Sequence, residues 1–166
     1  MNMIGLNGTD SSEGRGVEIL EAVGLGMAAG AIGTVALTCA ERAEMKLTGR
    51  QPSTVPGQIG AKLVGRDPQA NTALVERLDP IVHWGHGIGL GAVRGLLGVA
   101  GLGPVAGTLV FYPVVWGGDA ALYRALGIAP APWRWTRAEL ATDLFGKAVL
   151  AFATSGAYVL LARAAQ

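Results

Sequence analysis

The sequence has few of the charged residues that a water-soluble domain needs on its surface. They make up 15% of the 166 residues, against about 25% in an average soluble domain. Hydrophobic residues reach 51%, and the mean hydropathy is +0.40. Because so few charges cannot easily cover a water-facing surface, this composition favours a protein embedded in a lipid bilayer. The alternative is a small soluble helical domain rich in alanine and glycine.

Further absences argue against common kinds of site. Cys39 is the single cysteine, so the chain can form no internal disulfide and holds no cysteine cluster for a structural metal. The formal net charge is only +1, which argues against nucleic acid as a partner. The sequence also lacks a Gly-x-Ser-x-Gly elbow, a Walker phosphate loop and a His-Glu-x-x-His zinc motif. We therefore expect no catalytic residue, no metal and no cofactor.

Four apolar stretches are each long enough to cross a bilayer. A hydrocarbon core of roughly 30 Å needs about 20 apolar residues in a helix that rises 1.5 Å per residue. No strand-like alternation competes with this pattern. The expected spans are residues 22–40, 81–102, 105–126 and 139–163, each boundary being approximate. Four helices with short connections predict an all-α fold, a four-helix integral membrane bundle.

Local signals predict where some of these helices begin and end. Gly49 is a helix stop after a charged extension of the first span. Asp79 and Pro80 are typical of an N-cap followed by proline at the first helical position. Thr136 with Glu139 three residues later forms a capping box. These signals predict a flexible tail over residues 1–16, a single membrane domain over residues 17–166 and, between its first two spans, a loop over residues 41–80.

Basic residues are distributed unequally between the two expected ends of the bundle. The end that holds both termini and the 101–104 turn has only Arg15 and Arg163. The other end holds nine: Arg42, Lys46, Arg50, Lys62, Arg66, Arg77, Arg124, Arg134 and Arg137. Since basic residues concentrate in cytoplasmic loops, we expect loop 41–80 in the cytoplasm and both termini outside.

Glycines recur at intervals of four in two of the expected spans. Gly26 and Gly30 lie in the first span, and Gly87, Gly91 and Gly95 lie in the second. Residues four apart share a helix face, and glycine on that face lets two backbones approach closely. These residues are therefore expected to pack helices together. The repeat leaves open whether the partner helix belongs to the same chain or to another.

Ionisable residues inside the expected spans form an intramembrane polar cluster. Its members are His83, His86, Arg94, Asp119, Asp143 and Lys147. With 1.5 Å per residue from the middle of each span, three of them share one depth, roughly 6–8 Å to the cytoplasmic side of the midplane. These three are His86, Asp119 and Lys147. His83 and Asp143 lie deeper toward the cytoplasm, and Asp143 and Lys147 are four apart and can pair.

Two interpretations of this cluster stay open. The formal charges of Arg94, Lys147, Asp119 and Asp143 sum to zero, which favours internal ion pairs that lock the helices together. The alternative is a polar cavity that opens to the cytoplasm and binds a solute or relays protons, since histidine titrates near neutral pH. The hypothesis that the two histidines bind a metal or a haem has less support, because the carboxylate residues that usually accompany such histidines are missing.

Several short motifs resemble those of small bacterial inner-membrane proteins of the YagU-like family and its actinobacterial relatives. They include Gly30-x-x-Gly33-Thr34, Gly49-Arg50-x-Pro52-Ser53, His83-Trp84-x-x-Gly87-x-x-x-Gly91-x-x-x-Gly95 and Gly127-x-Ala129-Pro130-x-Pro132-Trp133. The resemblance implies a four-helix membrane fold in a bacterial cytoplasmic membrane and assigns no activity. We expect a non-enzymatic packing or accessory subunit of a homo-oligomer or a membrane complex. The alternative function is transport or proton-coupled conduction through the polar cluster.

Overall fold

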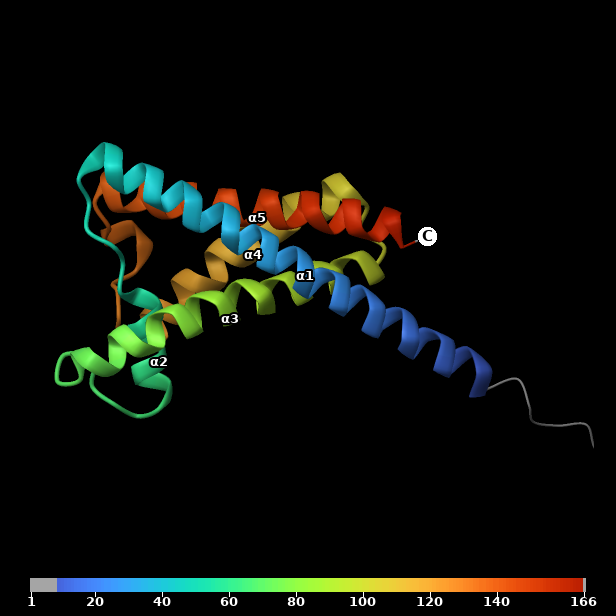
Figure 1. Cartoon of the computed structure of the whole chain (residues 1–166), viewed down its shortest axis with the longest axis horizontal. Coiled ribbons are helices and arrows are strands. Elements are labelled where there is room, and N and C mark those ends of the chain that lie inside the picture. Colours follow the sequence, from blue (N-terminus) through green and yellow to red (C-terminus); the bar gives the residue numbers. More distant parts are fainter. Residues whose placement is uncertain (1–8, 166) are drawn as a thin grey trace, which may run out of the picture.

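The computed structural model of the protein describes residues 9–165, and these residues fold entirely as helices and connections. The all-α prediction is therefore confirmed. Figure 1 shows the arrangement of the helices. They are α1 (Thr9–Thr48), α2 (Val55–Leu63), α3 (Thr72–Val99), α4 (Pro104–Ala125), the short 3-10 helix η1 (Pro132–Arg134) and α5 (Arg137–Ala164).

Three of these helices are long and apolar enough to cross a membrane. They are α1 from Gly14 to Thr48, α4 and α5. The helix α3 is as long as α5, at 28 residues, but histidines, Arg94 and several glycines lower its apolar character. Three such helices indicate a membrane protein, while the fourth crossing, by α3, stays a prediction.

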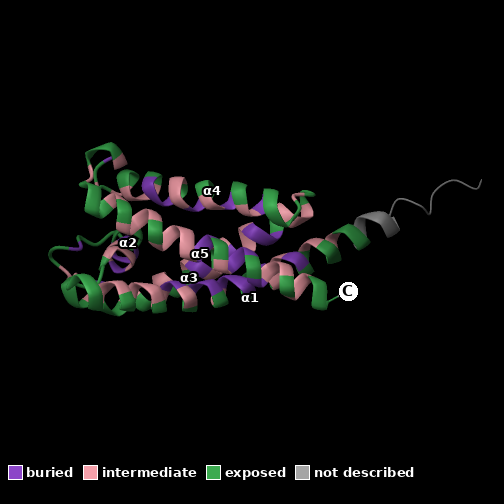
Figure 2. Cartoon of the chain, turned by 90° about the horizontal axis from the view of Figure 1, so that it is seen from above, coloured by how far each residue is buried: buried purple, intermediate pink, exposed green. Residues whose placement is uncertain are grey.

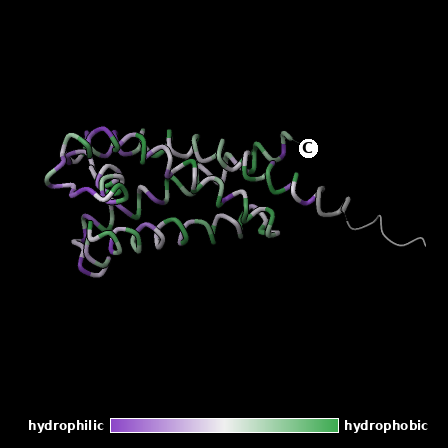
Figure 3. The backbone as a smooth tube through the Cα atoms, turned by 90° about the horizontal axis from the view of Figure 1, so that it is seen from below, coloured by the Kyte–Doolittle hydropathy of each residue, from purple (hydrophilic) through white to green (hydrophobic). Residues whose placement is uncertain are grey.

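The long helices lie side by side and bury one face each. Within the bundle, α1 packs most extensively against α3 and α5, while α4 packs against α5 and, less extensively, against α3. Figure 2 shows that buried positions lie where the helices face one another. The core cluster consists of Leu37, Phe111, Val115, Leu150 and Ala151. Hydrophilic segments gather at the end of the bundle that holds α2 (Figure 3).

The outer faces of the long helices carry large apolar side chains that are exposed in the described part of the chain. Examples are Ile32 and Val35 on α1, Leu109 on α4, and Phe152 and Leu160 on α5. A soluble monomer rarely exposes so many large apolar side chains. Lipid tails would cover these side chains without cost, which agrees with the apolar lengths of α1, α4 and α5.

The backbones of α1 and α3 approach each other closely. A side-chain carbon added to Gly91 would overlap the carbonyl oxygen of Gly26 and the Cα of Gly30. One added to Gly95 would overlap the carbonyl oxygen of Ala22. Because nothing larger than hydrogen fits between the two helices here, these positions require glycine. In this structure the partner of each glycine face is the other helix of the same chain.

Two predicted helix boundaries are present in the structure. Helix α1 ends at Thr48, and Gly49 follows with a φ of +73°, a conformation that glycine adopts without strain. At the start of α5, the backbone N–H of Glu139 donates to the Thr136 hydroxyl at 3.2 Å. The N–H of Thr136 in turn donates to the Glu139 carboxylate at 2.8 Å. The predicted capping box is therefore confirmed.

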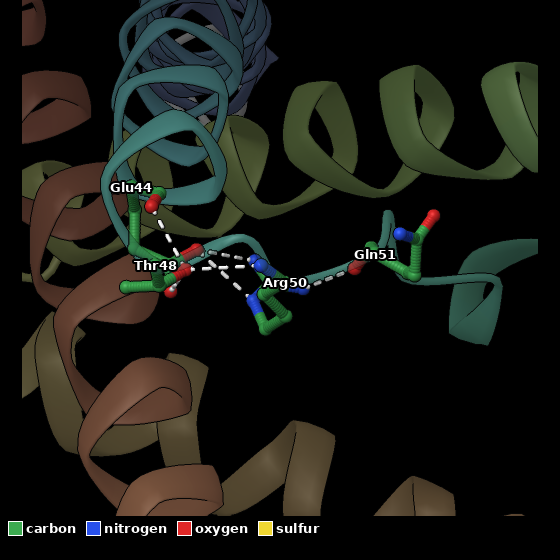
Figure 4. Close-up of polar contacts among 4 residues, drawn as sticks. All are labelled: Glu44, Thr48, Arg50 and Gln51. Atoms are coloured by element: carbon green, nitrogen blue, oxygen red, sulfur yellow. Dashed lines mark hydrogen bonds and ion pairs between the residues drawn. The ribbon is translucent and has the colours of Figure 1, made fainter.

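An ion pair fixes the direction in which the chain leaves α1. Figure 4 shows the Arg50 guanidinium turned back onto the Glu44 carboxylate, with Nη2 and Oε2 2.8 Å apart. The Thr48 hydroxyl donates to the carbonyl of Glu44 at 2.9 Å and accepts from the N–H of Arg50 at 3.2 Å. These contacts satisfy polar groups at a helix end that would otherwise lack partners.

Two other boundaries differ from the prediction. Helix α1 already begins at Thr9, so it includes part of the predicted tail, because no proline interrupts the chain from there to Thr48. Helix α3 begins at Thr72, and Pro80 lies inside it. The Asp79 carboxylate does not cap a helix that starts there. It accepts instead from the N–H of Gly57 at 2.9 Å, which ties the beginning of α2 to α3.

Glycine substitutions on α3 test the backbone contact with α1. We expect Gly91→Ala to lower the stability of the bundle by roughly 1–3 kcal/mol, because the added carbon meets the α1 backbone. The matched control is Gly89→Ala on the same helix, where a side-chain carbon meets open space. Alanine there should be neutral or stabilising by up to about 1 kcal/mol. Equal shifts of the thermal unfolding midpoints in detergent would contradict this packing.

Candidate functional site

Side chains from three helices converge on one buried carboxylate. Asp119 of α4 is only 3% exposed, and its Oδ1 lies 2.8 Å from Nε2 of His86 on α3. Its other oxygen, Oδ2, forms an ion pair with Nζ of Lys147 on α5. We call these residues, with Tyr123, the three-helix cluster. The structure thus brings together the three residues that the sequence placed at one depth.

Tyr123 is the member of the cluster that sequence reasoning missed. Nζ of Lys147 donates to its hydroxyl at 3.0 Å and lies 5.6 Å from the centre of its ring. The same hydroxyl is 3.5 Å from Oδ2 of Asp119. A signal for it does exist in the sequence, because Asp119 and Tyr123 are four apart and share a face of α4.

The buried face of α4 explains why Asp119 points inward. Gly107, Phe111, Val115 and Asp119 are all buried and follow one another at intervals of four residues. Positions at this spacing lie along one stripe of a helix. Asp119 therefore continues the core-facing stripe of α4 toward the end of the bundle that holds α2, and the carboxylate must find its partners within the protein.

The contacts of Asp119 balance its charge. Both carboxylate oxygens have partners, and Lys147 supplies one positive charge against one negative charge. A carboxylate can only accept hydrogen bonds, so Nε2 of His86 is the donor, and a neutral imidazole suffices for that. With His86 neutral, the three-helix cluster carries no net charge. In such a pair, removal of one charge leaves the other buried and uncompensated, which is strongly destabilising.

The predicted ion pair between Asp143 and Lys147 is not among the ion pairs of the described residues, although the two are one turn apart on α5. Nζ of Lys147 reaches across to α4, where the Asp119 carboxylate and the Tyr123 hydroxyl bind it together. Oδ2 of Asp143 is buried without a hydrogen-bond partner, and so is Nε1 of Trp116 on α4. These two residues lie near each other beside the three-helix cluster.

His83 and His86 have different partners. Nε2 of His83 lies 3.0 Å from the hydroxyl of Thr38 on α1, whereas His86 contacts Asp119 on α4. In the described part of the chain, no three histidine, cysteine or acidic side chains come together as a metal site would require. Cys39 is exposed on the outer side of α1.

Arg94 lies apart from the three-helix cluster, in the other half of the bundle. It is only 1% exposed, its Nε donates to the hydroxyl of Ser155 at 3.1 Å, and its guanidinium lies 4.8 Å from the ring centre of Tyr158. The guanidinium rests against Gly107 of α4, where any side chain would overlap it. Its Nη1 has no hydrogen-bond partner. Among the described residues, its partners are thus a hydroxyl and an aromatic ring.

Comparison of the chain with protein-family models, with curated proteins and with solved structures gave no match. The resemblance to the YagU-like family therefore stays a prediction. The geometry of the bundle has to carry any functional argument.

Replacing Asp119 tests whether the three-helix cluster holds the bundle together. Asp119→Asn leaves the Lys147 charge buried without a carboxylate, so we expect a loss of roughly 3 kcal/mol or more. The double variant Asp119→Asn with Lys147→Met removes both charges and should recover part of that loss. The measurement is thermal unfolding in detergent, with Glu18→Gln on the exposed start of α1 as control. A single variant as stable as the control would contradict the structural role.

Proposed function

We propose that the chain is a four-span protein of a bacterial inner membrane, with α3 as the fourth crossing and both termini outside. Three observations support α3 as a span: it packs along α1 through glycine, it contacts α4 and α5, and it contributes His86 to the three-helix cluster. The excess of basic residues at the end with α2 supports the orientation. The resemblance to the YagU-like family supports the bacterial membrane.

We further propose that the protein is a non-enzymatic accessory subunit that binds a second copy or a larger membrane complex. The observation that carries this proposal is the first part of α1. That part continues past the other helices of the bundle as an arm (Figure 1). On this arm Val17 is 64% exposed and Leu20 is 73% exposed. Apolar side chains that the bundle leaves uncovered at a helix end are suited to contact another protein.

The glycine faces are poor candidates for this role. Gly26 and Gly30 are occupied by Gly91 and Gly95 within the same chain, so a partner could reach them only if α1 and α3 separated. The outer side of α1 is different, because Met27 and Val35 are exposed there. A partner helix would therefore bind along the arm and the outer side of α1.

The contacts of the polar cluster agree with a structural role. Asp119 is nearly inaccessible, and both of its oxygens are engaged by side chains from neighbouring helices. A general base or a nucleophile needs an accessible atom within reach of a substrate. These contacts therefore favour a role in holding the helices together over a role in catalysis.

A charge placed on the arm tests the accessory function. We expect Leu20→Asp to reduce recovery of the co-purifying partner, or of the homo-oligomer, by roughly tenfold, since a charge costs at least 1.4 kcal/mol in an apolar contact. Gly14→Asp is the matched control, because it adds the same charge to a position of the arm where nothing lies nearby. Both variants should unfold at the same temperature as the unmodified protein.

Purification in gentle detergent with mass spectrometry provides this readout. An unmodified protein that is monomeric and elutes alone would contradict the proposal. So would a Leu20→Asp variant that keeps its partner at the original stoichiometry.

Proton-coupled transport is a second candidate function, and one observation favours it. His86 is 35% exposed while its Nε2 contacts the buried Asp119, so it links the surface of the helix to the interior. Histidine can accept and release protons near neutral pH. Asp143, with an unpartnered buried oxygen next to the cluster, offers a further acceptor.

Flux measurements on reconstituted vesicles test this candidate. His86→Gln keeps a hydrogen-bond donor for Asp119 but cannot titrate near neutral pH, so it should abolish proton flux while leaving the fold intact. His83→Gln, outside the three-helix cluster, should retain flux. A pH-sensitive dye inside the vesicles reports the result, and an unmodified protein without proton flux would exclude the candidate.

A further inference from the structure

A basic pocket lies where the chain passes from α4 to α5. Its volume is about 560 Å³, and we call it the Arg124 pocket. Its walls are formed by Arg124, Ala129, Pro130, Ala131, Trp133 and Arg134. Two arginines thus line the pocket, and none of its lining residues is acidic.

The surrounding sequence keeps this pocket positive. No acidic residue occurs between Asp119 and Glu139, a stretch that contains three arginines. Asp119 is bound by His86 and Lys147, and Glu139 is engaged by Thr136 in the capping box. Among the ion pairs of the described residues, none joins Arg124 or Arg134 to a carboxylate.

Several contacts hold the pocket in shape. Gly127 turns the chain after α4 with a φ of +66°. The indole Nε1 of Trp135 donates to the carbonyl of Pro130 at 2.7 Å, and the N–H of Arg134 donates to the carbonyl of Ala131 at 2.8 Å. Proline at 130 and 132 further restricts the backbone. A wall that is already ordered loses little conformational entropy when a ligand binds.

The chemistry of the lining selects an anion that carries an apolar part. A guanidinium presents several N–H donors in a plane and binds phosphate oxygens in pairs. Trp133 is 80% exposed, and the Arg124 guanidinium lies 5.8 Å from its ring centre. Exposed tryptophan is typical of the boundary between lipid and water, where its ring contacts glycerol and the first acyl carbons.

The position of the Arg124 pocket at the ends of two apolar helices favours a phospholipid headgroup as the source of the phosphate. Arg124 is in the last turn of α4 and Arg134 precedes α5, and both helices are long and apolar enough to cross a membrane. The pocket therefore lies at the level where phospholipid headgroups begin. We propose that the Arg124 pocket binds the phosphate of an anionic phospholipid headgroup, with Arg124 and Arg134 as the phosphate ligands and Trp133 against the glycerol. This inference depends on the membrane placement proposed above, and it is independent of the accessory function.

Native mass spectrometry of the detergent-purified protein with phosphatidylglycerol tests this binding. The variant Arg124→Gln with Arg134→Gln should retain roughly tenfold less phosphatidylglycerol, because two charge-assisted hydrogen-bonding groups are lost. The matched control, Arg66→Gln with Arg77→Gln, removes the same charge from exposed positions at the same end of the bundle. It should bind phosphatidylglycerol as the unmodified protein does. Arg124→Lys with Arg134→Lys, which keeps the charge but loses the planar donors, should bind at an intermediate level.

Three results would overturn the lipid proposal. One is an equal loss of phosphatidylglycerol in both glutamine double variants, which would indicate a general effect of charge. Another is retention of phosphatidylcholine as strong as that of phosphatidylglycerol. The third is displacement of phosphatidylglycerol by an equal concentration of inorganic phosphate, which would make free phosphate the ligand.

Extraction of the protein from its membrane by alkaline carbonate would refute the membrane placement itself. That outcome is separate from the binding result. It would overturn the lipid proposal together with the proposed four-span topology, whereas failure of the Leu20→Asp experiment would leave the Arg124 pocket untouched.

Discussion

The backbone contact between α1 and α3 is the constraint on which the rest of the bundle depends. In a bilayer, helices gain no hydrophobic energy by meeting, so close packing of small residues has to hold them together. A separate glycine of α1 serves α5, because Gly33 gives room to Thr154 of that helix. The buried hydroxyl of Thr34 stays satisfied, since it donates to the carbonyl of Gly30 in its own helix at 2.8 Å. Thr34 lies against Gly87 of α3, so its own helix supplies the partner that the glycine face of α3 cannot offer.

Helix α4 is attached by different means, since it packs less extensively than α1 does. Polar side chains hold it at two levels. Asp119 reaches His86 and Lys147 near one end, and Gly107 receives the Arg94 guanidinium in the other half. Such interactions are directional, so they fix the rotation of α4 about its axis, which apolar packing alone specifies poorly. The bundle thus combines a pair of helices whose backbones are in close contact with a helix, α4, that adds polar contacts to its apolar packing through Phe111 and Val115.

The sequence predicted what depends on local chemistry and missed what depends on neighbours in space. The capping box at Thr136 and the stop at Gly49 need only a few adjacent residues, and both are present. The helix start predicted at Asp79 and Pro80 was wrong, because Asp79 binds the N–H of Gly57 in α2 and the helix continues through the proline. The glycine repeat around Gly91 predicted which face of the helix packs closely, but not which helix packs against it. Periodicity shows which residues share a face and contains no information about the neighbouring helix.

The same distinction between local chemistry and neighbours in space applies to the candidate site. Counting residues from the middle of each span placed His86 and Lys147 at one level, since depth depends on rise per residue alone. Depth alone could not predict that Lys147 pairs with Asp119 on α4 and not with Asp143 in its own helix, because the pairing depends on how both helices are rotated about their axes. The choice also decides the surroundings of Asp143. Because Lys147 binds Asp119, the Asp143 carboxylate loses the cation that lies one turn away in its own helix, and its Oδ2 is buried without a hydrogen-bond partner.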